Sequence, residues 1–362
     1  MVNVIDASQQ FECRQHQLSL IKLFKQQLVN VSVAEWPCSG GKTCTLYADA
    51  LYQSHLKPQV KIFVVVPRPV NRAIAISKLG VSQHNMTVQG RGGIFVCTQS
   101  QYFALDPQHL KGSLLVLDEF HNFMKSSKAI KYLKMHSKVH SVSATLGGEA
   151  GHERYRDLFR SNNLSFQIVK GQKEHVDEPV VDLQAVEVDA VQGRLSPRGQ
   201  LLSTALEVVE DKVANGQQVI LFVRNTFECK DLHKQLTAKT FADQGIQPRL
   251  LDEKNEPAVW ATIAMLDAIE QGTSKVNVVV TTPASSTGIN IFPRCHVVFT
   301  DKPSDFYDFM QAIGRSNRKE FNGIQEGTWV ALAEEYKDPA ILMSELKCKH
   351  LTASKQKVRY SQ

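Results

Sequence analysis

The sequence contains no apolar run long enough to cross a membrane. Its longest apolar stretches, IFVVV (62–66) and NVVVTT (277–282), have the length of β-strands. The N-terminus, MVNVIDASQQ, has no basic region followed by an apolar one, so we expect no secretion signal. These features argue against membrane-spanning and secreted proteins, and we expect a cytoplasmic protein that does not bind membranes.

Cysteine is sparse and its spacing is irregular. No two of the cysteines form a Cys-x-x-Cys motif, which argues against a structural zinc site and against a dithiol redox centre. An odd number of scattered cysteines fits reduced thiols, in agreement with a cytoplasmic location. The seven cysteines lie at positions 13, 38, 44, 97, 229, 295 and 348.

Acidic residues are scarce in one long segment. Between Ala50 and Gly148 there are twelve Lys and Arg residues but only three acids, and no acid occurs from Ala50 to Leu105. The segment 50–148 therefore carries a net charge of +9 (12 − 3), whereas the whole chain carries +6. Two interpretations are open: a solvated basic face, or a surface that follows a phosphate backbone. The lysines of KSSKAIKYLKMHSK (125–138), spaced by threes and fours, predict a solvated helix face first and a nucleic-acid contact second.

Apolar, β-branched runs alternate with amphipathic stretches along the whole chain. Short strands that alternate with helices predict an α/β fold, in which mostly parallel sheets are flanked by helices. In the first half we expect strands at 32–35, 61–66, 93–97, 113–117 and 139–142, and helices at 14–29, 43–54 and 71–79. In the second half we expect strands at 218–223, 249–251, 276–281, 295–300 and 328–332, and helices at 203–215, 226–239, 257–271 and 304–313.

The sequence changes in character near residues 171–190. The stretch GQKEHVDEPVVDLQAVEVDA is acidic, contains Pro179 and is typical of a linker that leads into an edge strand. We therefore expect two α/β domains of similar size, at 1–172 and 191–346, joined by a linker at 173–190. The remaining residues, 347–362, are expected to form a basic tail.

The stretch EWPCSGGKTC (35–44) lies between an expected strand and an expected helix, where phosphate-binding loops occur. Gly41, Lys42 and Thr43 fit the end of the pattern Gly-x-x-x-x-Gly-Lys-Thr, but Trp36 replaces its first glycine. Backbone N–H groups of such a loop surround a polyphosphate, and the N-terminus of the following helix adds positive potential. The lysine pairs with the β and γ phosphates, and the threonine hydroxyl binds Mg²⁺. A chance Gly-Lys-Thr after a strand is the alternative.

A second polar group follows the expected strand in LLVLDEFH (114–121). Asp118 and Glu119 come directly after four apolar residues, at the carboxyl end of the strand. Ligands bind at this end of the strands in open α/β sheets. Asp118 is therefore a candidate Mg²⁺ ligand, and Glu119 is a candidate for polarising an attacking water. The alternative is a surface Asp-Glu pair, but its position some 75 residues after a phosphate loop favours an ATPase site.

Several motifs resemble those of the superfamily 2 helicases. DEFH (118–121) matches their Asp-Glu-x-His box, and SVSATLGG (141–148) contains their Ser-Ala-Thr motif. MQAIGRSNRKE (310–320) matches their Gln-x-x-Gly-Arg-x-x-Arg motif, and WPCSGGKT (36–43) is similar to their phosphate loop, whose first position is often not glycine. Further similarities, in the family's order, occur at 11–17, 64–73, 96–100, 219–229 and 278–293, so the resemblance spans residues 11–335.

The resemblance implies a role for each matching residue. A nucleotide site would be formed by Gln17, Pro37, Cys38, Ser39, Gly40, Gly41, Lys42, Thr43, Gly288 and Asn290, with Mg²⁺ held by Thr43 and Asp118. The catalytic residues would be Glu119, Gln311, Arg315 and Arg318, with Arg318 as an arginine finger. Ser143 and Thr145 would link hydrolysis to movement on nucleic acid. The nucleic-acid backbone would be contacted by Arg68, Thr98, Arg224 and Thr282.

We therefore expect a DExH-type superfamily 2 helicase core. Two RecA-like domains would face each other across a cleft that binds ATP and Mg²⁺, and the chain is expected to be a monomer. RNA and DNA, single-stranded or duplex, are both open, because no base-reading motif is visible. Two other classes are open as well: a translocase or remodeller that separates no strands, and a nucleic-acid-binding adaptor with weak ATPase activity, which Trp36 would suggest.

Overall fold

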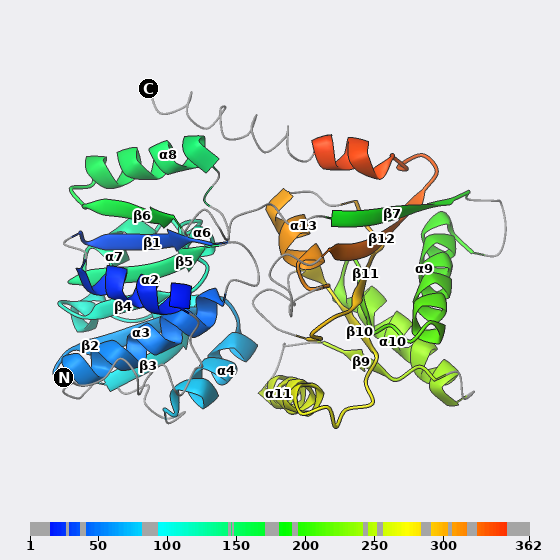
Figure 1. Ribbon diagram of the computed structural model, residues 1–362, viewed down its shortest axis with the longest axis horizontal. Coiled ribbons are helices and arrows are strands. Elements are labelled where there is room, and N and C mark those ends of the chain that lie inside the picture. Colours follow the sequence, from blue (N-terminus) through cyan, green and yellow to red (C-terminus); the bar gives the residue numbers. More distant parts are fainter. Residues whose placement is uncertain are drawn as a thin grey trace. The chain divides into compact units, whose positions relative to one another are not determined.

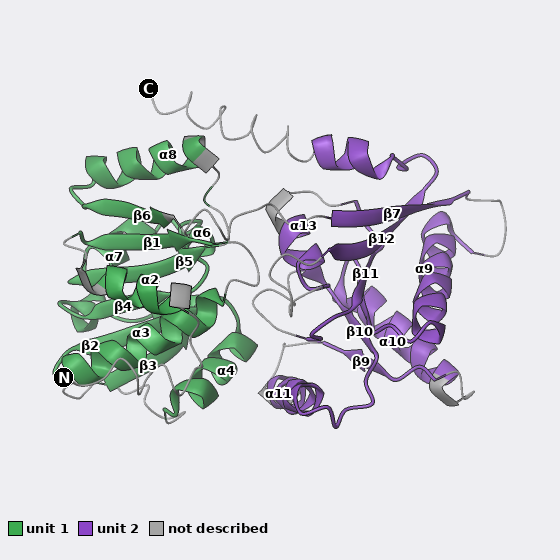
Figure 2. Ribbon diagram, in the orientation of Figure 1, with its two compact units in different colours: residues 1–177, 354–362 green, residues 178–353 purple. Residues whose placement is uncertain are grey.

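The computed structural model describes residues 15–26, 29–36, 41–81, 93–143, 146, 148–170, 181–189, 195–241, 245–251, 256–283, 291–302, 306–316 and 324–345. The chain divides into two compact units, which Figure 2 shows in different colours. Unit 1 comprises residues 1–177 with 354–362, and unit 2 comprises residues 178–353. The division falls inside the segment 173–190 that the sequence marks as a linker.

Unit 1 contains a six-stranded sheet with helices on both of its faces (Figure 1). All neighbouring strands run parallel, so their carboxyl ends meet at one edge of the sheet. The strands are β1 (Val31–Glu35), β2 (Lys61–Val66), β3 (Gly93–Thr98), β4 (Leu114–Leu117), β5 (Lys138–Ser143) and β6 (Phe166–Lys170), in the order β3-β2-β4-β5-β1-β6. The helices are α2 (Gln15–Gln26), α3 (Lys42–Leu56), α4 (Pro69–Leu79), α5 (Gln99–Tyr102), the 3₁₀ turn η1 (Pro107–Leu110), α6 (Phe120–Phe123), α7 (Ala129–Leu133) and α8 (Gly148–Ser161).

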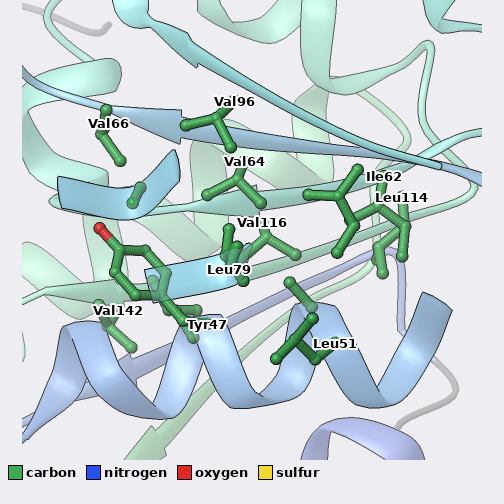
Figure 3. Close-up of a cluster of buried hydrophobic side chains, with 14 of the residues drawn as sticks. Tyr47, Leu51, Ile62, Val64, Val66, Leu79, Val96, Leu114, Val116 and Val142 are labelled. Atoms are coloured by element: carbon green, nitrogen blue, oxygen red, sulfur yellow. The ribbon is translucent and has the colours of Figure 1, made fainter. Parts of the chain in front are cut away.

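Both faces of this sheet are buried, as continuous apolar strands require. Alternate residues of β2 enter two different hydrophobic clusters: Ile62, Val64 and Val66 in the cluster of Figure 3, and Phe63 and Val65 in the other. Helices α2, α3 and α4 contribute to the first cluster, and α5, α6, α7 and α8 contribute to the second. The sheet therefore holds its carboxyl edge rigidly between two packed layers.

Unit 2 contains a second six-stranded sheet, again with all neighbouring strands parallel. Its strands are β7 (Val181–Val188), β8 (Val219–Phe222), β9 (Pro248–Leu250), β10 (Val278–Thr281), β11 (His296–Phe299) and β12 (Gln325–Leu332), in the order β7-β12-β11-β8-β10-β9. Its helices include α9 (Pro197–Ala214), α10 (Thr226–Phe241), α11 (Glu256–Glu270) and α13 (Phe306–Ile313). Strand β7 lies at the edge of the sheet and within the segment expected as a linker, so residues 181–188 belong to unit 2.

The α/β class is confirmed, and most of the expected strands and helices are present with ends that differ by a few residues. Strand β6 and helix α8 are absent from the sequence-based prediction. The lysine-rich segment 125–138 also differs: it contains only the five-residue helix α7 between turns, because one turn suffices to bury Ala129, Tyr132 and Leu133. Its lysines at 125, 128, 131 and 134 are exposed. Within the described ranges, no helix combines the length and apolar character that crossing a membrane requires.

Candidate functional site

The carboxyl edge of the unit 1 sheet gathers the main residues that the sequence marks for nucleotide chemistry. Gly41 lies beyond the end of β1, Asp118 follows β4, and Ser143 ends β5. Because β4, β5 and β1 are consecutive neighbours, these positions lie along one edge. Eight expected site residues lie outside the described part of the chain: Pro37, Cys38, Ser39, Gly40, Thr145, Gly288, Asn290 and Arg318.

Gly41 allows the chain to enter helix α3. Its φ of 73° is left-handed, which glycine adopts without strain, and a Cβ at this position would lie 2.1 Å from Nε2 of Gln17. Gln17 Nε2 donates a hydrogen bond to Gly41 O over 2.9 Å, and Thr45 Oγ1 donates to the same oxygen over 3.0 Å. Gln17, expected at the nucleotide site, is therefore held against the start of α3.

Trp36 belongs to the core of unit 1. Its side chain is 6% exposed and packs in the same hydrophobic cluster as Leu20 and Phe24 of α2. Its backbone N–H donates to Ser143 O over 3.0 Å, so residue 36 continues the pairing of β1 with β5. Trp36 does not have a positive φ. The backbone at this position thus extends the sheet and needs no glycine.

Asp118 is buried beside Thr43. Thr43 Oγ1 donates to Asp118 Oδ2 over 3.2 Å, while Asp118 Oδ1 is buried without a hydrogen-bond partner in the described structure. Burial and the neighbouring Glu119 carboxylate raise the pKa of Asp118 to about 7, although Lys42 and Thr43 act in the opposite direction. Lys42, at the start of α3, is itself 8% exposed. A cation bound next to Asp118 would stabilise the ionised form of this carboxyl group.

The chemistry of this pair fits Mg²⁺. The ion takes oxygen ligands, and proteins usually supply one or two carboxylates while phosphates and water supply the rest. The described residues contain no group of three or more His, Cys, Asp or Glu that could hold a metal ion. The unpartnered Asp118 oxygen beside the Thr43 hydroxyl is thus suited to a metal that arrives with a phosphate ligand.

Glu119 lies at a tight turn between β4 and α6. Its φ of 56° is left-handed, which is uncommon for a residue other than glycine and occurs often at functional sites. The buried Glu119 Oε2 lies 3.4 Å from Nδ1 of His121, and the same nitrogen forms a 2.9 Å hydrogen bond with Ser143 Oγ. A chain of polar contacts therefore connects Glu119 to the first residue of the Ser-Ala-Thr motif.

Two expected nucleic-acid contacts in unit 1 differ in exposure. Arg68 is half-buried and precedes α4 as its N-cap residue. Thr98 is 6% exposed and caps α5: its Oγ1 accepts a hydrogen bond from Gln101 N and contacts Ser100 Oγ at 3.0 Å. The Thr98 hydroxyl therefore caps α5, and its expected contact with nucleic acid stays a prediction.

Two of the expected residues of unit 2 lie at the corresponding edge of its sheet, and two others lie at the end of α13. Strand β8 ends at Phe222 and β10 at Thr281, so Arg224 and Thr282 lie at the carboxyl edge. Gln311 lies in the last turn of α13 and Arg315 lies just beyond it; their exposed fractions are 8% and 5%. In the described structure, Gln311 Nε2 is buried without a hydrogen-bond partner.

Arg224 is part of a network of four charged residues. Asp301, just after β11, accepts from Arg224 Nε and from Arg198 Nη2, each over 2.8 Å. Arg198 of α9 also donates to both carboxylate oxygens of Glu228, over 3.0 and 2.6 Å. Glu228 in turn accepts from the backbone N–H of Arg224 over 3.2 Å. The network fixes the segment that follows β8 to two helices and to the end of β11.

The comparisons with known proteins agree with this geometry. Residues 200–320 match the family described as helicase conserved C-terminal domain. The Mycobacterium smegmatis helicase Lhr, in a structure bound to ssDNA and AMP-PNP, matches 94% of this chain at 15% identity with a TM-score of 0.65, over 48% of its own chain. Residues 200–320 thus resemble a helicase C-terminal domain, and the fold of the chain is similar to that of the helicase Lhr.

Two structures of the DUF1998 helicase MrfA give the same result. The DNA-bound structure matches 92% of our chain with a TM-score of 0.65, and the structure with DNA and AMPPNP matches 91% with a TM-score of 0.63, both at 16% identity. These matches cover 48% and 50% of the MrfA chain, so our chain spans about half the length of the helicases it resembles. No curated protein sequence matches it. The expected fold of two tandem RecA-like domains is thereby confirmed.

Two groups of interacting polar residues are missing from the sequence-based prediction. The first is the Arg198–Asp301 network described above. In the second, Glu35 at the end of β1 accepts from Leu146 N over 2.6 Å and lies 2.5 Å from His152 Nε2. Both Glu35 and Asp301 lie at the carboxyl end of a buried strand, which is the signal that identified Asp118 and could have identified them.

The Asp118→Asn variant is expected to be more stable than the parent at pH 8 when nucleotide and metal are absent. Because burial raises the pKa of Asp118 from 3.8 to about 7, the folded protein keeps a proton that the unfolded chain loses as the pH rises through this range. The aspartate therefore lowers the free energy of unfolding increasingly from pH 4 to 7, by as much as about 4 kcal/mol. Asparagine does not ionise, so the Asp118→Asn variant should lack this pH dependence of the free energy of unfolding.

Urea unfolding in EDTA at pH 5 and pH 8 measures the effect. The gain from Asp118→Asn should be larger at pH 8 than at pH 5. The matched control is Asp157→Asn, whose side chain is 75% exposed and which should change stability little at either pH. An equal gain at both pH values would mean that packing, and not the ionisation of Asp118, is responsible.

Proposed function

We propose that the chain is the core of an ATP-dependent superfamily 2 helicase of the DExH type, which couples ATP hydrolysis to movement on RNA or DNA or to its unwinding. The observation that carries the proposal is the 3.2 Å hydrogen bond between Thr43 and Asp118, which joins residues 75 positions apart beside the buried Lys42. The two motifs that would bind a nucleotide and its metal are thus in contact. Relatives of the same fold bound to ssDNA and AMP-PNP support this reading.

Each residue at this edge would have a defined task. Lys42 would pair with the β and γ phosphates of ATP. Thr43 and Asp118 would hold Mg²⁺, which neutralises charge on the transferred phosphoryl group. Glu119 would orient the attacking water and accept its proton. Arg315 and Arg318 of unit 2 would neutralise charge near the γ-phosphate, a task that suits the permanently charged guanidinium.

The path of the nucleic acid is a further part of the proposal. Arg68 in unit 1, and Arg224 and Thr282 in unit 2, would contact its backbone. The contacts from Glu119 through His121 to Ser143 offer a route by which hydrolysis would be sensed at the Ser-Ala-Thr motif. Because the proposed residues come from both units, hydrolysis would depend on closure of the two units, which bound nucleic acid would favour.

The Lys42→Ala variant tests the proposal. ATP hydrolysis is measured without nucleic acid, with single-stranded RNA and with single-stranded DNA. We expect at least one polymer to stimulate the parent, and Lys42→Ala to lower the stimulated rate by about 100-fold or more, since it removes a charge that stabilises the transition state. Lys78→Ala, an exposed lysine on α4, is the matched control and should behave as the parent does.

The outcomes separate the three classes of function. If the parent binds nucleic acid but hydrolyses no ATP with either polymer, the chain is neither a helicase nor a translocase. The nucleic-acid-binding adaptor is then the remaining class of function. A parent that hydrolyses ATP is then tested on a forked duplex with one fluorescent strand. Strand release identifies a helicase, and hydrolysis without release identifies a translocase or remodeller.

A further inference from the structure

One surface of unit 2 combines an exposed aromatic ring with basic side chains. It consists of Arg224, Phe227, Lys230 and Lys234, at the end of β8 and along α10, and we call it the α10 surface. The side chain of Phe227 is 79% exposed, more than any other large apolar residue that the structure describes. Lys230 and Lys234 follow it at helical spacing, three and seven residues on, and both are exposed.

The backbone beneath this ring is held firmly. Asn225 Oδ1 accepts hydrogen bonds from the N–H groups of both Phe227 and Glu228, each over 3.0 Å. The N–H of Arg224 donates to Glu228, whose carboxylate is in turn bound by Arg198. Phe227 is therefore an exposed ring on a fixed base, since the network anchors the residues on either side of it.

The neighbourhood of the ring is mixed in charge. Asp301 pairs with Arg224, and Asp231 is exposed on α10, where it accepts a hydrogen bond from Gln235. Along the chain, Phe227 lies between Arg224 and the two exposed lysines of α10, Lys230 and Lys234. Because its side chain is 79% exposed, most of the ring is accessible to a ligand.

A single exposed apolar side chain is common on protein surfaces, so the basic neighbours of the ring, and not its exposure alone, indicate a ligand. Surfaces that bind single-stranded nucleic acid combine aromatic rings, on which bases stack, with cations that follow the phosphates. We propose that the α10 surface binds single-stranded nucleic acid, with Phe227 stacking on one base while Arg224, Lys230 and Lys234 contact the phosphates on either side. This inference rests on the proposed function and adds a base contact to a path otherwise described by backbone contacts.

The test measures binding of the full chain to a fluorescein-labelled 20-nucleotide oligo-dT and oligo-rU by anisotropy. Phe227→Ala should weaken binding by about tenfold, the effect expected for loss of one stacked base. Phe227→Tyr keeps an aromatic ring and should bind as the parent does. Phe227→Leu keeps apolar area without a ring and should bind as weakly as alanine. With an abasic oligonucleotide, the parent and Phe227→Ala should bind equally.

Trp260→Ala is the matched control. Trp260 is 40% exposed on α11, a helix whose sequence contains no lysine or arginine. Its replacement should leave binding unchanged. Circular dichroism confirms that each variant is folded.

The binding test distinguishes a failure of this inference from a failure of the proposed function. If the parent binds the oligonucleotides and Phe227→Ala binds equally well, the inference is wrong while the proposed function stands. If Phe227→Leu binds as the parent does while Phe227→Ala binds more weakly, Phe227 makes an apolar contact with the oligonucleotide, and stacking is excluded. If the parent binds no oligonucleotide, both are wrong.

Discussion

The Glu119→Gln variant should hydrolyse ATP at least about 100-fold more slowly than the parent in the presence of a stimulating nucleic acid, since a positioned general base contributes about 10²–10⁴-fold. Glutamine has the size of glutamate but cannot accept the proton of the attacking water. The side chain of Glu119 is buried at the carboxyl edge, directly after Asp118, on a left-handed backbone that fixes its direction. The variant should therefore keep the shape of the site but lose the general base that accepts the proton of the attacking water.

Steady-state hydrolysis with saturating single-stranded RNA or DNA measures this effect. The affinity for a fluorescent ATP analogue should change little, because Glu119 is not expected to bind the nucleotide. Glu153→Gln, at an exposed position on α8, is the matched control and should hydrolyse ATP normally. If Glu119→Gln retains the parental rate, another residue must activate the water and the DEFH assignment fails.

The Asp49→Ala variant should lower the free energy of unfolding of unit 1 by about 2–6 kcal/mol, since two buried groups would lose their acceptor and each unsatisfied buried polar group costs about 1–3 kcal/mol. Asp49 of α3 is fully buried, and its Oδ2 lies 2.7 Å from Nδ1 of His140 on β5. Gln53 Nε2 donates to the other oxygen over 3.2 Å, and Phe24 stacks on the His140 ring with centroids 4.8 Å apart. Alanine would leave two buried polar groups without this acceptor.

Urea unfolding followed by circular dichroism measures the loss. Asp49→Asn keeps an oxygen acceptor and should be less harmful than alanine. A double-mutant cycle with His140→Leu isolates the energy of the pair, because the second replacement should cost little once the first partner is absent. If Asp49→Ala and the parent unfold at the same urea concentration, the pair does not support the contact between α3 and β5.

Local sequence was sufficient for the strands that are apolar throughout. Strand β2 (Lys61–Val66) was predicted with its observed ends, because only a buried strand explains five consecutive apolar residues. Strand β6 was not predicted, since Phe166, Gln167 and Lys170 give no such run. Its position depends on pairing with β1 and on hydrogen bonds from Ser165 to Asn30, 135 residues away. Contacts at that separation cannot be read from a local pattern.

The same limit applies to the site. Asp118 and Thr43 were predicted as partners because each belongs to a motif with a known place in the fold, and they are in contact. The pairing of Arg224 with Asp301 joins residues 77 positions apart and belongs to no motif that the sequence showed. The capping role of Thr98 was missed for a different reason: a threonine before Gln-Ser-Gln suits both a cap and a ligand contact, and the sequence does not show the hydrogen bond from Gln101 N.

Trp36 has a consequence for how such proteins are recognised. It continues the ladder between β1 and β5 and fills space in the core, so a glycine there would keep the hydrogen bond to Ser143 but leave a cavity the size of an indole. A search pattern that demands glycine at this position would reject the chain, although the residues proposed to approach phosphate lie further along. Motif definitions built on backbone position would accept it, because they ask where the sheet ends and the loop begins.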